Sequence, residues 1–239
     1  MKRIRITPSI IPNMFTAMNM FCGFLSIINA SEHNYIYASW MIIIAAIFDA
    51  LDGVMARLTK SSSQLGVQLD SLSDVVSFGV APAYLIYSSY LYQYYAIGIV
   101  ISSLLMIAGG FRLARFNVQL VGFDKAYFTG LPIPSSALTI AAFVIAYYSN
   151  NIFTEEITFL IIPMVILLSY LMVSKIKYDS LPKFNKEDFN KKAYLYILPL
   201  LVVASLFFIP LKRILFFSFV FIVVFGIFRH IYSLIAKKS

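Results

Sequence analysis

The sequence has 239 residues, of which 60% are hydrophobic and 13% are charged, and its formal net charge is +8. Soluble domains contain about a quarter charged residues, so this composition excludes a single soluble domain and indicates an all-α polytopic membrane protein. The basic residues lie at the ends of apolar segments and not in a patch interleaved with aromatic residues. This arrangement favours anionic membrane lipids as partners and argues against nucleic acid.

The N-terminus imitates a secretory signal, because MKRIR precedes an apolar stretch. The stretch runs from Ile10 to about Ala30, however, which exceeds the roughly 7–15 residues of a signal core, so we expect a retained first helix. Cys22 is the only cysteine. An intrachain disulfide and a cysteine-based zinc site are therefore excluded.

A membrane span needs about 20 mostly apolar residues, and on this basis we predict about eight transmembrane helices. Their approximate ranges are 10–30, 35–58, 66–92, 95–116, 134–149, 155–175, 194–210 and 212–235. Only Pro210 and the pair Lys212 and Arg213 divide the last two helices, so six or seven spans remain an open alternative.

One long hydrophilic run, residues 175–192, divides six helices from a C-terminal pair. We predict a six-helix bundle over residues 1–175, a cytoplasmic loop over 176–193 and a transmembrane helix pair over 194–239. With both termini in the cytoplasm, all Lys and Arg except Lys212 and Arg213 lie on or near the cytoplasmic side, as the positive-inside rule requires. The expected location is the cytoplasmic membrane.

Four carboxylates interrupt the second and third predicted helices: Asp49, Asp52, Asp70 and Asp74. Ionisable groups at membrane depth are costly, so they are functional candidates. Asp49 and Asp52 are three residues apart, and Gly66, Asp70 and Asp74 follow at steps of four, so each set lies on one helical stripe. The connection between the helices is short and polar, so we expect two antiparallel helices with facing stripes near the cytoplasmic surface.

Four carboxylates brought together repel one another unless they are partly protonated or neutralised by cations. Oxygen ligands favour hard ions, which here means Mg²⁺ or Mn²⁺, with Ca²⁺ also suitable. Two such cations suit displacement at phosphorus, because they can bind a diphosphate and offset charge on the leaving phosphate. The alternative is an ion pathway in a transporter, which predicts acidic residues spread through several spans, whereas here they are confined to two helix ends.

The complete pattern is D-x-x-D-G-x-x-A-R, eight residues, and then G-x-x-x-D-x-x-x-D. It resembles the signature of the CDP-alcohol phosphotransferases, membrane enzymes that move a phosphoalcohol from a cytidine diphosphate to a second alcohol and release CMP. The matching residues are Asp49, Asp52, Gly53, Ala56, Arg57, Gly66, Asp70 and Asp74. The six-helix bundle would then be the catalytic part of the chain.

The resemblance implies a role for each matching residue. The four aspartates would hold two divalent cations, and Asp74 would also be the base for the acceptor hydroxyl. The CDP and diphosphate pocket would be lined by Gly53, Ala56, Arg57 and Gly66. On the first helix, Asn13 and Thr16 are further candidates for contacts with the CDP-linked lipid. Close helix packing explains the glycines equally well, and capping or interhelical bonding explains Asn13 and Thr16 equally well.

Four further stretches resemble the phosphatidylserine synthase branch of this family: residues 12–24, 77–83, 109–117 and 128–137. This branch uses L-serine as the acceptor, and a serine carboxylate calls for a cation. Arg112 and Arg115, followed by Asn117, supply candidates at the cytoplasmic end of the fourth helix, since arginine suits bidentate carboxylate recognition. Positive-inside anchoring is the alternative explanation for both arginines.

The resemblance implies a homodimer that converts CDP-diacylglycerol, or its ether equivalent CDP-archaeol, and L-serine into a serine phospholipid and CMP. The nearest alternative is a relative that uses glycerol 3-phosphate or an inositol phosphate as acceptor. Those acceptors carry a phosphate and call for additional basic residues.

Overall fold

A computed structural model describes residues 10–59, 64–121, 130–150, 152–176 and 211–235. These ranges are almost entirely helical, which confirms the expected class of helical membrane protein. Within them, four helical stretches are long and apolar enough to cross a membrane: Ile10–Ser31, Gln64–Ser89, Leu91–Val118 and Glu155–Val173. Large apolar side chains on the outside of the bundle, such as Phe24, Ile97 and Phe111, suit contact with lipid.

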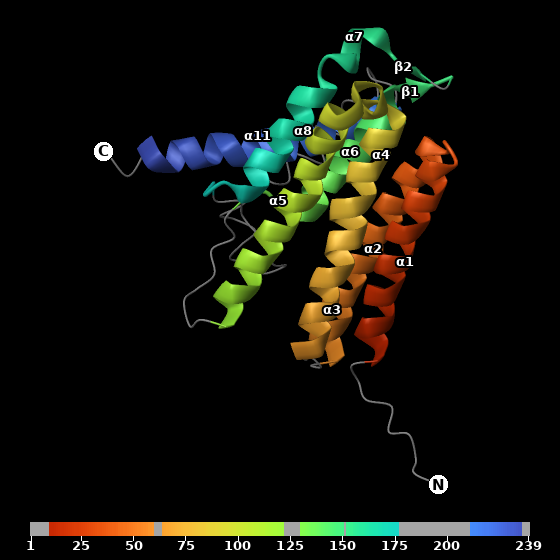
Figure 1. The fold of residues 1–239 in the computed structure, drawn as a ribbon. Helices are drawn as coiled ribbons and strands as arrows, with labels where there is room; N and C mark the ends of the chain where they lie inside the picture. Colours follow the sequence, from red (N-terminus) through yellow and green to blue (C-terminus); the bar gives the residue numbers. More distant parts are fainter. Residues whose placement is uncertain (1–9, 60–63, 122–129, 151, 177–210, 236–239) are drawn as a thin grey trace.

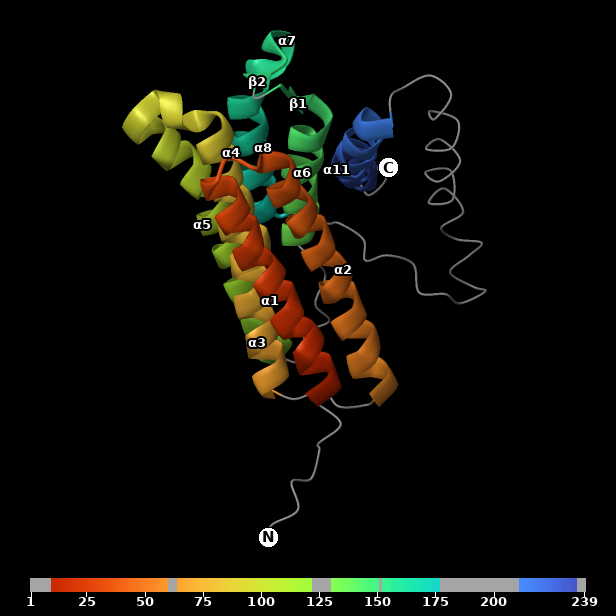
Figure 2. The ribbon, with the colours of Figure 1, turned by 90° about the vertical axis from the view of Figure 1, so that its right-hand side faces the viewer.

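The first helices closely follow the predicted ranges. Helix α1 (Ile10–Ser31) packs lengthwise against α2 (Tyr35–Thr59), and the two run in opposite directions (Figures 1 and 2). Next comes one rod that consists of α3 (Gln64–Asp74), the π-helix η1 (Val75–Val80) and α4 (Ala81–Ser89). The sequence predicts this rod as a single helix over 66–92 and gives no sign of the π-helical turn.

The remaining elements include one small hairpin. In chain order they are the 3₁₀-helix η2 (Leu91–Tyr94), α5 (Tyr95–Val121), α6 (Ile133–Tyr147), β1 (Tyr148–Ser149), β2 (Ile152–Phe153), α7 (Glu155–Thr158), α8 (Ile161–Val173) and α11 (Leu211–Ile235). The two strands pair antiparallel, with Tyr148 opposite Phe153. The predicted helix 155–175 is divided into α7 and α8, while the predicted helix 194–210 and nearly all of the loop 176–193 lie outside the described residues. The number of eight spans therefore stays a prediction.

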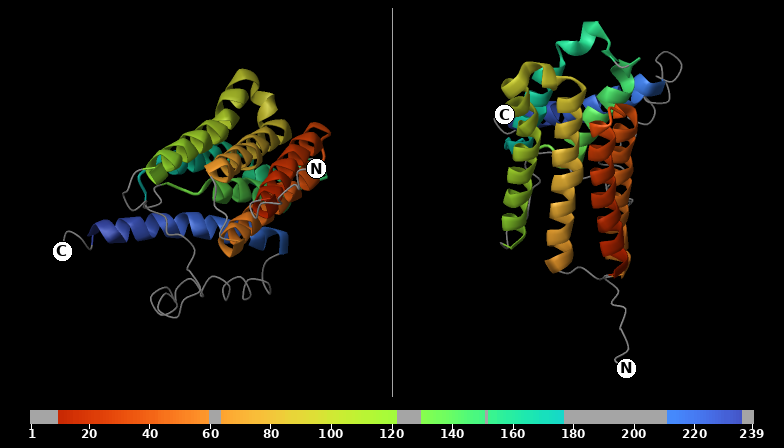
Figure 3. Two further views of the ribbon diagram at one scale, coloured as in Figure 1. Left: turned by 90° about the horizontal axis from the view of Figure 1, so that it is seen from below. Right: turned by 45° about the vertical axis from the view of Figure 1, so that its right-hand side comes forward.

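Helix α6 lies at the centre of the bundle. Most of its residues are buried, and it packs against α2, α4, η1 and α11. A helix that is apolar on all sides is expected in such a position. With 15 and 13 residues, α6 and α8 are shorter than α2 and α5, which have 25 and 27. As Figures 1 and 3 show, α1, α2, α3 and α5 extend further than α6 and α8 at one end of the bundle.

Aromatic side chains gather at the opposite end, which we call the hairpin end because β1 and β2 lie there. The Tyr35 hydroxyl donates to the Ser88 carbonyl oxygen at 2.6 Å, so it ties α2 to α4. The Tyr35 ring meets that of Tyr148 edge to face at 5.1 Å, and Tyr148 in turn contacts Phe153 at 5.0 Å. Such aromatic pairs stabilise packing beyond simple area burial. The hairpin end is therefore closed by direct contacts between α2, α4 and the hairpin.

Candidate metal centre and active site

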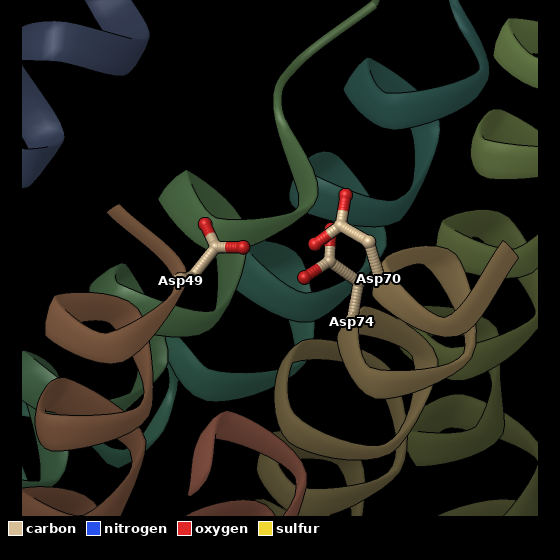
Figure 4. Close-up of side chains that lie close together, drawn as sticks. All are labelled: Asp49, Asp70 and Asp74. Carbon is tan, nitrogen blue, oxygen red and sulfur yellow. The ribbon is translucent and has the colours of Figure 1, made fainter. Parts of the chain in front are cut away.

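Three carboxylates converge between α2 and α3. Asp49 extends from α2 toward Asp70 and Asp74, which lie one turn apart on α3 (Figure 4). One oxygen of each lies within 4.8 Å of the others. Asp49 is ten residues before the end of α2 at Thr59, and Asp74 is ten residues after the start of α3 at Gln64. At 1.5 Å per residue, both are about 15 Å from the end of the bundle at which α2 ends.

The carboxylate oxygens of this cluster fit a divalent cation. Asp70 Oδ1 and Asp74 Oδ1 are buried, and neither has a hydrogen-bond partner among the described residues. A buried charged oxygen without a partner is costly, and three carboxylates at this spacing repel one another. A hard cation would satisfy the oxygens and remove the repulsion, since carboxylate oxygens are the ligands that such ions prefer.

Asp52 lies outside this group of three, although its charge interacts with those of Asp70 and Asp49. Its Oδ2 accepts a hydrogen bond of 2.9 Å from Thr16 Oγ1 on α1. Both side chains are buried, with 8% of Asp52 and 3% of Thr16 exposed. Asp52, the second aspartate of the signature, is therefore held in place by a hydrogen bond from α1.

Helix α1 also holds the rod that carries Asp70 and Asp74. Ser73 Oγ donates to the Thr16 carbonyl oxygen at 3.1 Å, and Ser77 Oγ donates to the Asn19 carbonyl oxygen at 2.9 Å. Gly23 permits this approach, because a Cβ at residue 23 would lie 2.6 Å from the Ser77 Cα. The π-helix η1 begins directly after Asp74, and single π-helical turns are frequent at functional sites.

Arg112 of α5 is a buried cation next to the carboxylates. Only 8% of its surface is exposed, and its charge interacts with that of Asp74. Its Nε is buried and has no hydrogen-bond partner among the described residues. An arginine that is buried with an unused donor is a candidate for binding an anionic group of a substrate.

Arg115 makes different contacts, although it is only one helical turn away. Its Nη1 donates to the Val173 carbonyl oxygen at 3.0 Å, and its Nη2 lies 3.4 Å from the carbonyl oxygens of Met172 and Ser174. These carbonyls form the C-terminal end of α8, where a cation is stabilising. Gly130 lies against the same end with φ of 89°, and its N–H donates to Ile176. Arg115 thus fastens α5 to α8.

Asn117 contacts the rod that carries Asp70 and Asp74. Its Nδ2 donates to Ser71 Oγ at 2.9 Å, and Ser71 follows Asp70 directly in the chain. The pair ties the end of α5 to α3. Sequence reasoning passed over Ser71, Ser73 and Ser77, although their placement between and after the aspartates could have suggested interhelical hydrogen bonds.

The residues expected to line the nucleotide pocket lie toward the end of the bundle at which α2 ends, opposite the hairpin end. A Cβ added at Gly53 would meet only Arg57 Nη1, at 3.9 Å, so packing between the described residues does not require a glycine there. Arg57 is exposed in the last turn of α2, and Gly66 lies in the first turn of α3. Asn13, near the start of α1, is half-buried, and so are Gly53, Ala56 and Gly66. The binding roles of these residues stay predictions.

The fold and the carboxylate cluster define a multi-pass helical membrane protein with a candidate divalent-metal centre between two helices. Residues 9–175 match the family described as CDP-alcohol phosphatidyltransferase. The chain belongs to this family, and this confirms the resemblance seen in the sequence.

Three similar proteins have names that refer to serine. The chain is 37% identical over 224 residues to the CDP-diacylglycerol–serine O-phosphatidyltransferase of Helicobacter pylori strain J99, which covers 94% of this chain and 92% of that protein. It is 36% identical to the protein of the same name from Bacillus subtilis strain 168, over 74% of this chain and 94% of the relative. It is also 39% identical to the archaetidylserine synthase of Methanothermobacter thermautotrophicus, over 70% and 69% of the two chains.

Proposed function

We propose that this protein transfers the phosphatidyl group of a CDP-linked lipid to the hydroxyl group of L-serine, with phosphatidylserine and CMP as products. The observation that carries the proposal is the convergence of Asp49, Asp70 and Asp74, with the buried Arg112 beside Asp74. Serine occurs in the names of all three relatives, whereas the lipid differs. The donor is therefore CDP-diacylglycerol or its ether equivalent, CDP-archaeol.

Four aspartates would hold two divalent cations, Mg²⁺ or Mn²⁺, with Ca²⁺ as a further candidate. They are Asp49, Asp52, Asp70 and Asp74. When bound, the cations supply positive charge that offsets the charge of the diphosphate and of the departing CMP. The orphan oxygens of Asp70 and Asp74 support this assignment.

Residues of the chain would carry out proton transfer, serine binding and nucleotide binding. Asp74 accepts the proton of the serine hydroxyl, the serine oxygen attacks the lipid-bearing phosphorus, and the bond from that phosphorus to CMP breaks. Arg112 pairs with the serine carboxylate. The nucleotide and diphosphate lie against Gly53, Ala56, Arg57, Gly66 and Asn13.

Arg115 and Asn117 are further candidates for serine binding, but each already has a partner in α8 or α3. They would have to exchange these hydrogen bonds for contacts with serine. Arg112, in contrast, has a buried donor to offer. Among the three, Arg112 is therefore our first candidate for recognition of the serine carboxylate.

The proposal includes the location and assembly of the protein. Both termini and the active site would face the cytoplasm from the cytoplasmic membrane, as the distribution of Lys and Arg indicates. The six-helix catalytic part would comprise residues 1–175, followed by the loop 176–193 and the helix pair 194–239. We also propose a homodimer, and this part of the proposal rests on the family resemblance alone.

The test is CMP release by the purified protein with one acceptor at a time. We expect release with CDP-diacylglycerol, Mg²⁺ and L-serine, and parallel reactions with CDP-archaeol identify the preferred donor. Release with glycerol 3-phosphate or an inositol phosphate, but not with serine, would reassign the protein to another branch of the family. Metal flux into protein-containing liposomes without any nucleotide would instead favour the transporter alternative.

A further inference from the structure

Thr16 is linked to both helices that carry the aspartates. Its hydroxyl lies 2.9 Å from Asp52 Oδ2 and 3.2 Å from the carbonyl oxygen of Pro12, one turn back on α1. The hydroxyl has a single proton, and a hydrogen bond to a carboxylate is about twice as strong as one to a neutral acceptor. The side chain of Thr16 is therefore committed to Asp52 on α2.

The backbone of the same residue reaches the other helix. The Thr16 carbonyl oxygen accepts the hydrogen bond from Ser73, which is fully buried and directly precedes Asp74. One turn further along α1, Ser77 Oγ donates in the same way to the Asn19 carbonyl oxygen. These side chains are buried, so water cannot readily replace the contacts, and they fix how α3 and η1 are placed along α1.

We propose that Thr16 is a positioning residue for the metal centre, which orients the Asp52 carboxylate and, through Ser73, the turn of α3 that carries Asp74. The proposal rests on the metal centre of the proposed function. It assigns Thr16 a role different from the lipid contact expected from the sequence. Groups that bond to metal ligands typically contribute 10- to 100-fold to metal affinity, because they hold each ligand in its binding orientation.

The test compares Mn²⁺ binding by the purified, metal-free protein, measured by electron paramagnetic resonance without substrate. Thr16→Val removes the hydroxyl and keeps the shape of the side chain, whereas Thr16→Ser keeps the hydroxyl. Thr139→Val is the matched control, because Thr139 is also a buried helical threonine, and its hydroxyl donates within α6 to the Ser135 carbonyl oxygen.

We expect Thr16→Val to weaken Mn²⁺ binding about 10- to 100-fold, while Thr16→Ser and Thr139→Val bind Mn²⁺ like the unchanged protein. In the CMP-release assay, Thr16→Val should raise the Mg²⁺ concentration needed for half-maximal rate and leave the KM for serine unaltered. A loss that arose only from poorer packing would appear equally in Thr139→Val.

Equal Mn²⁺ affinity of Thr16→Val and the unchanged protein would overturn the proposal. If Thr16→Val does not fold, Ser73→Ala decides, since it removes the contact on the side of Asp74 and should also weaken Mn²⁺ binding. Unchanged affinity would reject the proposal as stated, because the proposal includes the contact through Ser73. An unchanged protein that binds no Mn²⁺ would refute the metal centre of the proposed function itself, which is a different result.

Discussion

Arg112 and Arg115 lie one helical turn apart on α5 and meet different neighbours. Arg112 is buried beside Asp74 with an unused donor, whereas Arg115 donates to the last carbonyl oxygens of α8. Hydrogen bonds to charged groups contribute about 1.5–3 kcal/mol. We therefore expect Arg112→Gln to raise the KM for serine about ten- to a hundred-fold in the CMP-release assay and to leave the KM for CDP-diacylglycerol unchanged.

Arg115→Gln is the companion variant. It should lower the melting temperature of the detergent-solubilised protein, because the end of α8 loses its cationic partner, and it should change the KM for serine less than Arg112→Gln does. A larger rise in the KM for serine for Arg115→Gln than for Arg112→Gln would show that Arg115 leaves α8 to bind the substrate.

Asp74 carries the proposed proton transfer, so its replacement is the most direct test at the level of one residue. Asp74→Asn keeps the size of the side chain and removes the base, and general base catalysis typically contributes 10²–10⁴-fold. We expect CMP release to fall by at least this factor, with normal membrane insertion and an unchanged elution volume in size-exclusion chromatography. Appreciable serine-dependent turnover in this variant would exclude Asp74 as the base.

At the residue scale, the sequence identified the aspartates because their fixed spacing reflects the geometry of two facing helices. It did not reveal what Arg115 contacts, since its acceptor Val173 lies 58 residues further along the chain. Nor did it reveal that Thr16 meets Asp52, because a threonine next to apolar residues looks the same whether it bonds to its own helix or to another.

Between elements, the contact of α1 with η1 depends on Gly23. A Cβ there would overlap the Ser77 backbone, and overpacking of this kind costs about 1–3 kcal/mol. Gly110 on α5 is the matched control, because no atom of the described residues lies within 4 Å of a Cβ added there. We expect Gly23→Ala to lower the melting temperature and Gly110→Ala to maintain or raise it, since alanine favours a helix by about 1 kcal/mol over glycine.

Equal melting temperatures for the two alanine variants would contradict the close approach of α1 and η1. The comparison needs only thermal unfolding in one detergent, and both variants make the same chemical change inside a helix. It therefore separates the contact at Gly23 from the general effect of adding a methyl group.

Element boundaries could be predicted where polarity changes sharply, as it does at both ends of α1 and α2. The π-helical turn of η1 could not, because the residues VVSFGV are compatible with an ordinary α-helix and the turn depends on packing against α1. The break between α7 and α8 was also missed, since it falls at Phe159 and Leu160, which are apolar and continue without interruption into the apolar start of α8.

At the scale of the molecule, the predicted orientation can be tested by labelling single cysteines. Cys22 is buried and can be replaced by Ser to give a background without cysteine. Glu155→Cys at the hairpin end and Leu58→Cys at the opposite end would both be exposed. With intact cells, we expect a membrane-impermeant maleimide to label residue 155 at once and residue 58 only after permeabilisation.

The reverse labelling pattern would place the carboxylates on the outer face and contradict the positive-inside assignment.

Composition alone predicted the helical membrane fold, because apolar segments of this length have few other stable arrangements. The predicted helix 134–149 closely matches α6 (Ile133–Tyr147), whereas α8 (Ile161–Val173) is shorter than the predicted helix 155–175. Within a bundle, neighbouring helices and not the bilayer determine where a helix stops.

The aromatic contacts at the hairpin end limit the routes by which a lipid product could leave the bundle. The Tyr35 hydroxyl is hydrogen-bonded to α4, and its ring meets Tyr148 edge to face; Tyr148 in turn packs against Phe153, so neighbouring elements are joined at this end. If the proposed function and orientation hold, a newly made phospholipid would leave sideways into the leaflet from which its precursor came. The enzyme would then supply anionic lipid to the inner leaflet alone, and transbilayer asymmetry of this lipid would begin with its synthesis.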